Sequence, residues 1–275
     1  MKVFNLALSA LLASSSVLIV SSSDVVNSCT LADKPEPTGP YQAYSGDTKV
    51  AHAHIIFGDI SPDETETILN TLQTRDTKAT FFTHSDRITN ETKPLLQRMI
   101  KEGHTIGSMG QSSNPQIDFL YANNTFIEQQ ITSADAEFKD AIGFVPTLYM
   151  PSFGALDSRG QKILKENGKT TVMWSAGANG WWFVDNNEPL ETAVAALRYT
   201  LPEAGGIILM PTNAAILDEY LNQVWPYWKF VDFDTCTGSS SSKAKAAKAF
   251  GKSAKTKSAK SKEGGVDAKA DKASP

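Results

Sequence analysis

The stretch HIIFGDISPDETETILNTLQTRDTKATFF, residues 54–82, decides the fold. Its apolar run His54-Ile-Ile-Phe57 has the length and residue types of a buried strand. Ser61-Pro-Asp-Glu64 follows, with the pattern of a capping box and a proline at the first helical position. Apolar residues between 68 and 72 then mark one helix face, and Ala79-Thr-Phe-Phe82 is a second buried strand. A strand, a helix and a strand in this order predict a parallel βαβ unit.

The same alternation continues to the end of the apolar sequence. The clearest helix begins at the capping box Thr125-Phe-Ile-Glu128, has apolar residues every three or four positions, and ends at Gly143. Seven or so strand–helix units in about 200 residues predict a parallel sheet with helical crossovers, either a β/α barrel or an open sheet. Further strands are expected at 147–150, 171–174, 206–210 and 229–233, with helices between them, one of them over 190–201.

Residues 1–23 have the organisation of a secretory signal peptide. Lys2 is the only charge before Asp24, and an apolar stretch runs from Val3 to Val20. A membrane anchor is the alternative, but serines interrupt the stretch and it is barely long enough to span a bilayer. We therefore expect cleavage between Ser23 and Ser28. The mature protein is expected to be secreted, extracellular or in a cell wall, without a membrane contact.

Residues 24–50 are mostly polar and contain three prolines, so they predict an irregular lead-in to a domain over residues 51–236. Cys29 and Cys236 lie at the two ends of the folded region. In an oxidising compartment such a pair is expected to form a disulfide, and two unrelated thiols are the alternative.

Two Asn-X-Thr sequons, at Asn90 and Asn123, predict N-glycosylation. Both lie beside expected helix starts, where side chains are commonly exposed.

The composition changes after Cys236. Residues 237–275 contain ten lysines and three acidic residues, a formal charge of +7, which leaves −11 for the rest of a chain whose total is −4. The segment has too little apolar bulk for a core and predicts a disordered basic tail. Its clusters Lys245-Ala-Ala-Lys248 and Lys252-Ser-Ala-Lys255 resemble those of silaffin-type biosilica proteins, which would imply binding to an anionic surface or mineral. A solvated tail with loose affinity for polyanions is the alternative.

Six sequence motifs stand in the order and at the spacings of one protein family. They are Ile55-Ile-Phe-Gly-Asp59 with Lys78-Ala-Thr-Phe-Phe82, Gly103-His-Thr-Ile-Gly107, Tyr149-Met-Pro-Ser-Phe-Gly154, Val172-Met-Trp174 with Trp181, Gly206-Ile-Ile-Leu209, and Lys229-Phe-Val231. This set resembles the NodB-homology polysaccharide deacetylases, also called carbohydrate esterase family 4. The resemblance implies an α/β fold, the distorted (β/α)7–8 barrel of the NodB-homology type. It also implies removal of N- or O-acetyl groups from polysaccharides such as chitin and peptidoglycan; for an N-acetyl group this is hydrolysis of a carbon–nitrogen bond that is not a peptide bond.

The family chemistry needs a divalent metal held by one Asp and two His, a second Asp as general base, an Arg that orients the base, and a His as general acid. The resemblance places only the metal-binding Asp on a residue of the right type, Asp59. The remaining roles fall on Gly58 for the base, Met109 and Ser113 or Asn114 for the metal histidines, Met150 for the Arg, Ser175, Gly177 and Gly180 for the fourth-motif aspartates, and Pro211 for the acid.

These replacements predict a pseudoenzyme. A lone carboxylate does not substitute for three good metal donors, and loss of the base alone lowers a rate by about 10²–10⁴. We therefore expect no cofactor and no deacetylation by the family mechanism. Zinc or another divalent metal would be required only if the chain is an enzyme after all.

A relocated metal site is the alternative. His52 and His54 alternate on one strand and therefore face the same side, and His84 lies near the end of the next strand. Their ordinary interpretation is as polar or partly buried strand residues. His104 stands where the family often has a structural histidine.

Five aromatic residues are candidates for a glycan-binding groove, because apolar faces of sugar rings pack on aromatic planes. They are Tyr149, Phe153, Trp174, Trp181 and Trp182. Core positions are the favoured interpretation of Trp174 and Trp181, and Trp182 is the better candidate for an exposed position. Three function classes follow: a glycan-binding or wall-matrix protein with a chitin-like polysaccharide as partner, an active deacetylase with a relocated metal, and a structural component of a wall or mineral. None of them involves nucleic acid.

Overall fold

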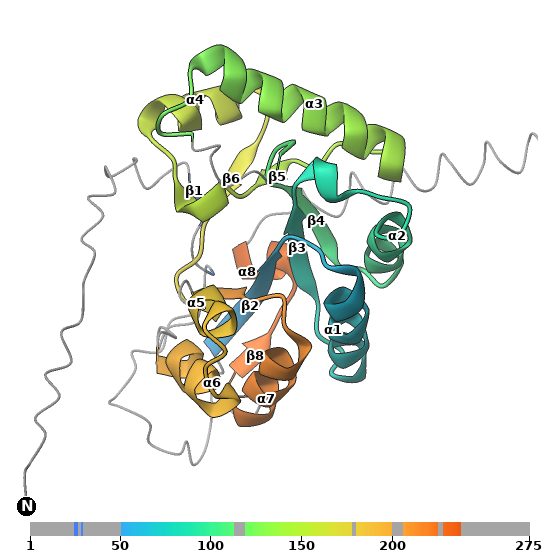
Figure 1. Cartoon of the computed structure of the whole chain (residues 1–275), viewed down its shortest axis with the longest axis vertical. Coiled ribbons are helices and arrows are strands. Elements are labelled where there is room, and N and C mark those ends of the chain that lie inside the picture. Colours follow the sequence, from blue (N-terminus) through green and yellow to red (C-terminus); the bar gives the residue numbers. More distant parts are fainter. Residues whose placement is uncertain are drawn as a thin grey trace, which may run out of the picture.

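Figure 1 shows a computed structural model of the chain. The structure describes residues 25–26, 29, 51–112, 119–177, 180–199, 206–224 and 228–237. The expected signal peptide, almost all of the lead-in and the basic tail beyond residue 237 lie outside the described residues, so those expectations stay predictions.

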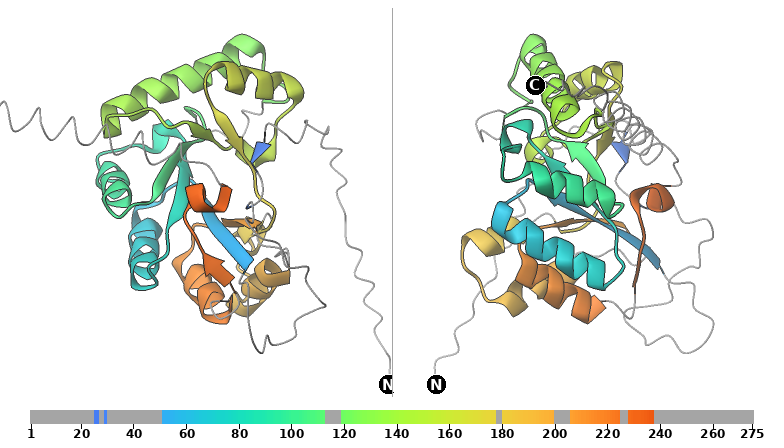
Figure 2. Two further views of the ribbon diagram at one scale, coloured as in Figure 1. Left: turned by 180° about the vertical axis from the view of Figure 1, so that it is seen from behind. Right: turned by 90° about the vertical axis from the view of Figure 1, so that its right-hand side faces the viewer.

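A curled sheet of eight parallel strands forms the centre of the domain (Figures 1 and 2). The strands are β1 (Val25–Val26), β2 (Ala51–Gly58), β3 (Ala79–Thr83), β4 (Thr105–Ser108), β5 (Leu148–Tyr149), β6 (Thr170–Val172), β7 (Gly206–Met210) and β8 (Trp228–Phe230). Their order is β1-β6-β5-β4-β3-β2-β7, and β8 pairs with the first residues of β2. Each pairing is parallel, as a chain of strand–helix units requires.

The open side of the curl is bridged by main-chain hydrogen bonds. The segment after β6 reaches β7, because Ser175 N–H and Ala176 N–H both donate to the carbonyl of Ile207, and Leu209 N–H donates to the carbonyl of Ala176. Gly177 follows with a φ of +88°, and a Cβ there would lie 2.2 Å from the carbonyl oxygen of Leu209, so this close approach needs glycine. The expected distorted β/α barrel is therefore confirmed.

Helices cover the outer face of the sheet (Figure 2). The described helices are α1 (Pro62–Thr74), η1 (Ser85–Arg87), α2 (Lys93–Lys101), α3 (Asn124–Ile142), η2 (Ser152–Gly154), α4 (Ser158–Glu166), α5 (Gly180–Asp185), α6 (Leu190–Tyr199), α7 (Ala214–Val224) and α8 (Phe233–Thr237). The last of them, α8, does not lie on this outer face, because its Phe233 and Cys236 pack inside the curl. One apolar cluster lies between the sheet and α1, α2, α6 and α7. A second fills the inside of the curl, where Ile56, Phe82, Ile207 and Leu209 meet the disulfide.

The expected disulfide between Cys29 and Cys236 is present, with Cα atoms 4.4 Å apart. It joins the segment after β1 to α8, across 207 positions of sequence. The expected lead-in needs one correction at its start: Val25 and Val26 are not irregular, because they pair with Thr171 and Val172 of β6 and extend the sheet.

Two helix starts differ from the capping-box predictions. Ser61 is the N-cap of α1, but Glu64 does not fold back on it; its carboxylate accepts a 2.7 Å hydrogen bond from Ala214 N–H, the first residue of α7. The helix α3 begins before Thr125, because the side chain of Asn123 is the N-cap and accepts from Phe126 N–H. Its end at Gly143, in the left-handed conformation, is as expected.

Candidate functional site at the carboxyl end of the strands

The carboxyl ends of the parallel strands meet at one mouth of the curled sheet. This mouth is therefore where ligands of β/α folds bind. It contains Gly58 and Asp59 after β2, His84 after β3, Met109 after β4, Met150 to Ser152 after β5, Trp174 after β6, and Pro211 and Thr212 after β7.

Asp59, the one retained family ligand, is held firmly from several sides. Its φ is +50°, in the left-handed region that aspartate tolerates better than most residues. The hydroxyl of Thr212 donates to the carbonyls of Gly58 and Asp59, at 2.8 and 3.0 Å. The carboxylate accepts from Thr83 Oγ1 at 3.2 Å and from the backbone N–H of His84 at 3.0 Å.

The imidazole of His84 completes the shell around this carboxylate. Its Nδ1 lies 3.0 Å from each carboxylate oxygen of Asp59. Burial raises the pKa of Asp59, but the hydrogen bonds and the charge interaction with His84 outweigh it, so the pKa of this carboxyl lies below its usual value. The carboxylate is ionised at neutral pH and already engaged by protein donors.

His84 has a second partner across the mouth. Its Nε2 lies 2.8 Å from the hydroxyl oxygen of Ser152, which follows β5. The imidazole is almost fully buried, with 6% of its side-chain surface exposed, whereas Ser152 is half-buried and stands next to the exposed Phe153. A carboxylate, an imidazole and a hydroxyl are thus connected in line by hydrogen bonds.

Apolar side chains occupy the positions where the family keeps its polar groups. Met150 is 2% exposed, and Met109 and Trp174 pack partly buried on the same cluster inside the curl. Gly58 and Pro211, at the base and acid positions, are buried. The apolar interior of the barrel therefore continues up into the mouth.

The donors at this mouth do not fit a family metal ion. Of the positions expected to hold the metal, Asp59 is engaged by His84, and Met109 offers a thioether, a soft ligand that suits copper(I) better than zinc. Ser113 and Asn114 lie outside the described residues. Among the residues that the structure describes, no group of three or more His, Cys, Asp or Glu is arranged to hold a metal ion.

The histidines of the relocated-site alternative are not brought together. His54 is buried in the first half of β2, where Nδ1 donates to the carbonyl of Val231 at 2.7 Å and Nε2 lies 2.9 Å from the hydroxyl of Thr80. His84 lies at the mouth, where its partners are Asp59 and Ser152. The side chain of His52 is not among those that the structure describes. His104 is a buried structural residue, as expected; its Nδ1 accepts from Ala79 N–H, and its pKa is lowered to about 4, mainly by burial.

The aromatic candidates divide into three groups. Tyr149 is a core residue and is withdrawn as a groove residue: it is fully buried, and its hydroxyl donates to the carbonyl of Met109. Trp174 is half-buried against the core. Phe153 and Trp182 are 71% and 55% exposed, and the side chain of Trp181 lies outside the described residues.

Strand alternation explains the error at Tyr149. Successive side chains of a strand face opposite sides, so Tyr149 faces α3 and α4 while Leu148 and Met150 face the inside of the curl. Tyr121 is a further exposed aromatic residue that was not among the candidates; it is 88% exposed and lies in the loop between β4 and α3.

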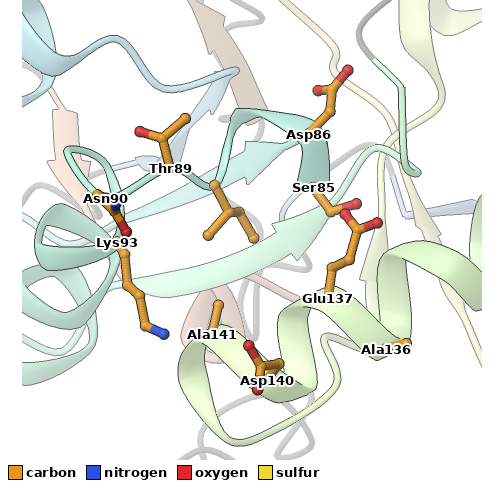
Figure 3. A pocket seen from close by; sticks show the side chains of 10 residues that line it. Ser85, Asp86, Thr89, Asn90, Lys93, Ala136, Glu137, Asp140 and Ala141 are labelled. Atoms are coloured by element: carbon orange, nitrogen blue, oxygen red, sulfur yellow. The ribbon is translucent and has the colours of Figure 1, made fainter.

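A separate pocket lies between η1, the start of α2 and α3 (Figure 3). It has a volume of about 750 Å³ and is lined mainly by polar and acidic side chains, among them Asp86, Glu137 and Asp140, with Lys93 opposite. Asn90 also lines it. Both sequon residues, Asn90 and Asn123, are exposed and stand just before helices, as expected from the sequence.

The contact of His84 with Asp59 and Ser152 was not foreseen. One signal was available: consecutive strands of a βαβ unit are commonly neighbours, so residues directly after β2 and β3 should meet. The contact with Ser152 had no such signal, because β4 lies between β3 and β5 in the sheet.

The family model described as polysaccharide deacetylase matches residues 45–172. This range contains the first three motifs and ends at β6. Chitin deacetylase 1 of Cryptococcus neoformans var. grubii is 28% identical over 116 residues, 42% of this chain and 24% of the relative. A peptidoglycan-N-acetylglucosamine deacetylase of Bacillus cereus is 26% identical over 163 residues, 58% of this chain and 57% of the relative. The chain thus spans about a quarter to just over half of these two relatives.

Solved structures show the same fold at lower identity. A peptidoglycan N-acetylglucosamine deacetylase superposes with a TM-score of 0.62 at 21% identity, over 72% of this chain and 94% of that one. A mutant of a carbohydrate esterase family 4 pseudoenzyme from Bacillus anthracis, with restored enzymatic activity, superposes with a TM-score of 0.59 at 17% identity, over 68% and 67%. Among the described helices, none is long and apolar enough to cross a membrane.

Proposed function

We propose that this chain, which belongs to the polysaccharide deacetylase family, is a secreted protein that binds a chitin-type glycan without removing its acetyl groups by the family's metal-dependent mechanism. Secretion is supported by the disulfide, which needs an oxidising compartment to form and persist. The loss of the family mechanism is carried by the composition of the mouth: Met109, Met150 and Trp174 make it apolar beside Asp59, whose carboxylate is engaged by His84.

The family mechanism needs a metal to polarise the acetyl carbonyl and to bind the attacking water. Met109 and Met150 take the places of a metal histidine and of the orienting arginine, and neither side chain can carry a charge. Met150 is packed inside the curl, where an arginine without a carboxylate partner would be a buried, unpaired charge. The base and the arginine were thus lost in a way that leaves no uncompensated charge.

Glycan binding is supported by the exposed aromatic residues around the mouth. Phe153 follows β5, and Trp182 lies on α5 after β6, where its ring meets that of Phe183 edge-on at 5.2 Å. Large aromatic residues exposed at a ligand-binding face are more informative than scattered apolar ones. A chitin-type glycan fits them, because the apolar faces of N-acetylglucosamine rings stack on aromatic planes.

Isothermal titration calorimetry with chito-oligosaccharides tests binding. We expect heat with the wild-type protein and a loss of affinity in Phe153→Ala and Trp182→Ala. Val145→Ala is the control, because Val145 is an exposed apolar residue that lies before β5, at the opposite end of the sheet. If no acetylated glycan gives heat, the binding proposal is wrong.

Acetate release from chitin oligomers tests the other half of the proposal. We expect no release above background with the purified protein, and no increase after zinc or cobalt is added. Stoichiometric bound metal together with metal-dependent acetate release would establish the alternative, an active deacetylase with a relocated site.

A further inference from the structure

We propose that Ser152, His84 and Asp59 form a catalytic triad for metal-independent hydrolysis of short-chain carboxylic esters. This inference goes beyond the proposed glycan binding and does not depend on it. It rests on three side chains from the ends of β2, β3 and β5, joined by contacts of 3.0 Å between Asp59 and His84 Nδ1 and 2.8 Å between His84 Nε2 and Ser152 Oγ.

The hydrogen-bond order assigns the role of each group. Asp59 is ionised and accepts only, so Nδ1 of His84 carries the hydrogen and donates to it. In the neutral ring Nε2 is then the acceptor, and the hydroxyl of Ser152 donates to it. This is the arrangement in which a carboxylate fixes the tautomer of a histidine and the histidine activates a serine.

The base is fixed in place before any substrate arrives. The backbone N–H of His84 also donates to Asp59 Oδ1, so both the main chain and the ring of His84 are fastened to the same carboxylate. Asp59 is fastened in turn by Thr83 and Thr212. Such prior positioning is what proton transfer in a transition state requires.

The nucleophile is reachable, in contrast to the base. Ser152 is half-buried at the start of η2, between the buried Pro151 and the exposed Phe153. Phe153 has a φ of +59°, a conformation that costs of order 1 kcal/mol for a residue with a side chain and is frequent at functional sites. The turn is held because Gly154 N–H donates to the carbonyl of Pro151, and the turn packs on Trp174. The backbone N–H of Phe153, next to the serine, is where serine hydrolases place one donor for the oxyanion.

The substrate class follows from what the site contains. An alcohol leaves more readily than an amine, so a serine–histidine–aspartate triad hydrolyses an ester more readily than an amide. The apolar side chains at this mouth, Met109, Met150 and Trp174, suit a neutral acyl group better than a charged one. An O-acetyl ester fits this description, whereas the N-acetyl amide of chitin does not.

The reaction balances without a co-reactant other than water. Ser152 Oγ attacks the acyl carbon, and its proton passes to Nε2 of His84. The alcohol leaves with that proton, and the acyl group stays as an ester on Ser152. Water then attacks the acyl-enzyme while His84 takes one of its protons and returns it to Ser152 Oγ, which releases the carboxylic acid.

Two measurements on the full chain in EDTA test the proposal. A fluorophosphonate probe followed by peptide mass spectrometry should mark Ser152, and p-nitrophenyl acetate should be hydrolysed with an initial burst. We expect Ser152→Ala and His84→Gln to lower the rate by at least about 10²-fold, and His84→Gln to abolish labelling. The matched control is Ser158→Ala, at the exposed first residue of α4, whose rate should equal that of the wild type.

The outcomes separate this proposal from the glycan proposal. Ser152→Ala should keep the calorimetric signal with chito-oligosaccharides, and Trp182→Ala should keep the labelling of Ser152. The triad is ruled out if the folded wild-type protein leaves Ser152 unlabelled, or if Ser152→Ala hydrolyses the ester as fast as the wild type. An activity that EDTA removes and zinc restores would also overturn it.

Discussion

His54 and His84 lie in two different regions of the barrel, the first in the amino-terminal half of β2 and the second at the mouth. Both ring nitrogens of each histidine have a hydrogen-bond partner, but the partners differ in kind. The partners of His54 are a main-chain carbonyl and a threonine hydroxyl, all buried in the core. The partners of His84 are an ionised carboxylate and a half-buried serine. Satisfied hydrogen bonds therefore do not distinguish a structural histidine from one that takes part in a reaction. The two are distinguished by the charge of one partner and by the solvent accessibility of the other.

Replacing each imidazole by a leucine side chain should give the largest difference in stability between the two regions. We expect His54→Leu to lower the free energy of unfolding by about 4 kcal/mol, because it leaves two buried polar groups without partners. His84→Leu should cost about 1 kcal/mol, because water can reach the partly exposed Asp59 and Ser152 in its place. Urea unfolding of both variants measures the difference, and equal losses would contradict it.

A charge introduced into the mouth should show that this region is now core. Met150→Arg is expected to destabilise the protein by about 3 kcal/mol, since the side chain is 2% exposed and no carboxylate stands at position 58. Met150→Leu is the volume-matched control and should cost less than about 1.5 kcal/mol. Adding Gly58→Asp to Met150→Arg should recover part of the loss, which a double-mutant cycle measures. A neutral Met150→Arg would mean that the mouth still accepts a cation.

A third histidine, His104, should make the stability of the protein depend on pH. The pKa of His104 is lowered to about 4 in the folded protein, against about 6.5 when unfolded, so the unfolded state binds more protons between these values. Its contribution to stability is present above pH 6.5 and is lost as the pH falls toward 4. We expect a loss of about 2 kcal/mol between pH 7 and pH 5 from this residue.

His104→Gln should flatten the stability profile over that interval. The check is urea unfolding of both proteins at pH 7, 6 and 5. If the two profiles run parallel, His104 is not the residue that titrates.

The smallest expected effect concerns the connection between helices below the mouth. Glu64→Gln should cost about 1 kcal/mol, because a charged acceptor at the N-terminus of α7 becomes a neutral one. Glu66→Gln is the control, since Glu66 lies on the same helix and is exposed. Thermal unfolding at low and high salt shows whether the effect is electrostatic. An electrostatic effect on the melting temperature should become smaller at high salt.

Much of the fold was predictable because the signals are local. The βαβ unit, the glycine ends of α2 and α3 and the strand at 206–210 each follow from residue patterns within about 20 positions. The disulfide followed from the placement of only two cysteines in the chain. Glu64 shows the limit: its sequence position is that of a capping box, but a backbone N–H 150 residues away binds it instead.

The site was only partly predictable, because its contacts join residues that are far apart in the sequence. The sequence predicts, position by position, that the family's charged residues are replaced, and this stays a prediction. The register of the two-residue strand β5 with β4 and β6 decides which side chains face the inside of the curl. It places Met109 and Met150 in the interior and turns Tyr149 away from it. The contact between His84 and Ser152, 68 positions apart, depends on three strand ends meeting at once.

Under the proposed loss of the metal-dependent mechanism, the contact of His84 with Asp59 also determines how that mechanism could be restored. Replacing Met109 and residue 113 or 114 with histidines would restore donors, yet the third donor would still be occupied by an imidazole and a main-chain amide. Reactivation by substitution therefore has to begin with the removal of a histidine rather than with the addition of two.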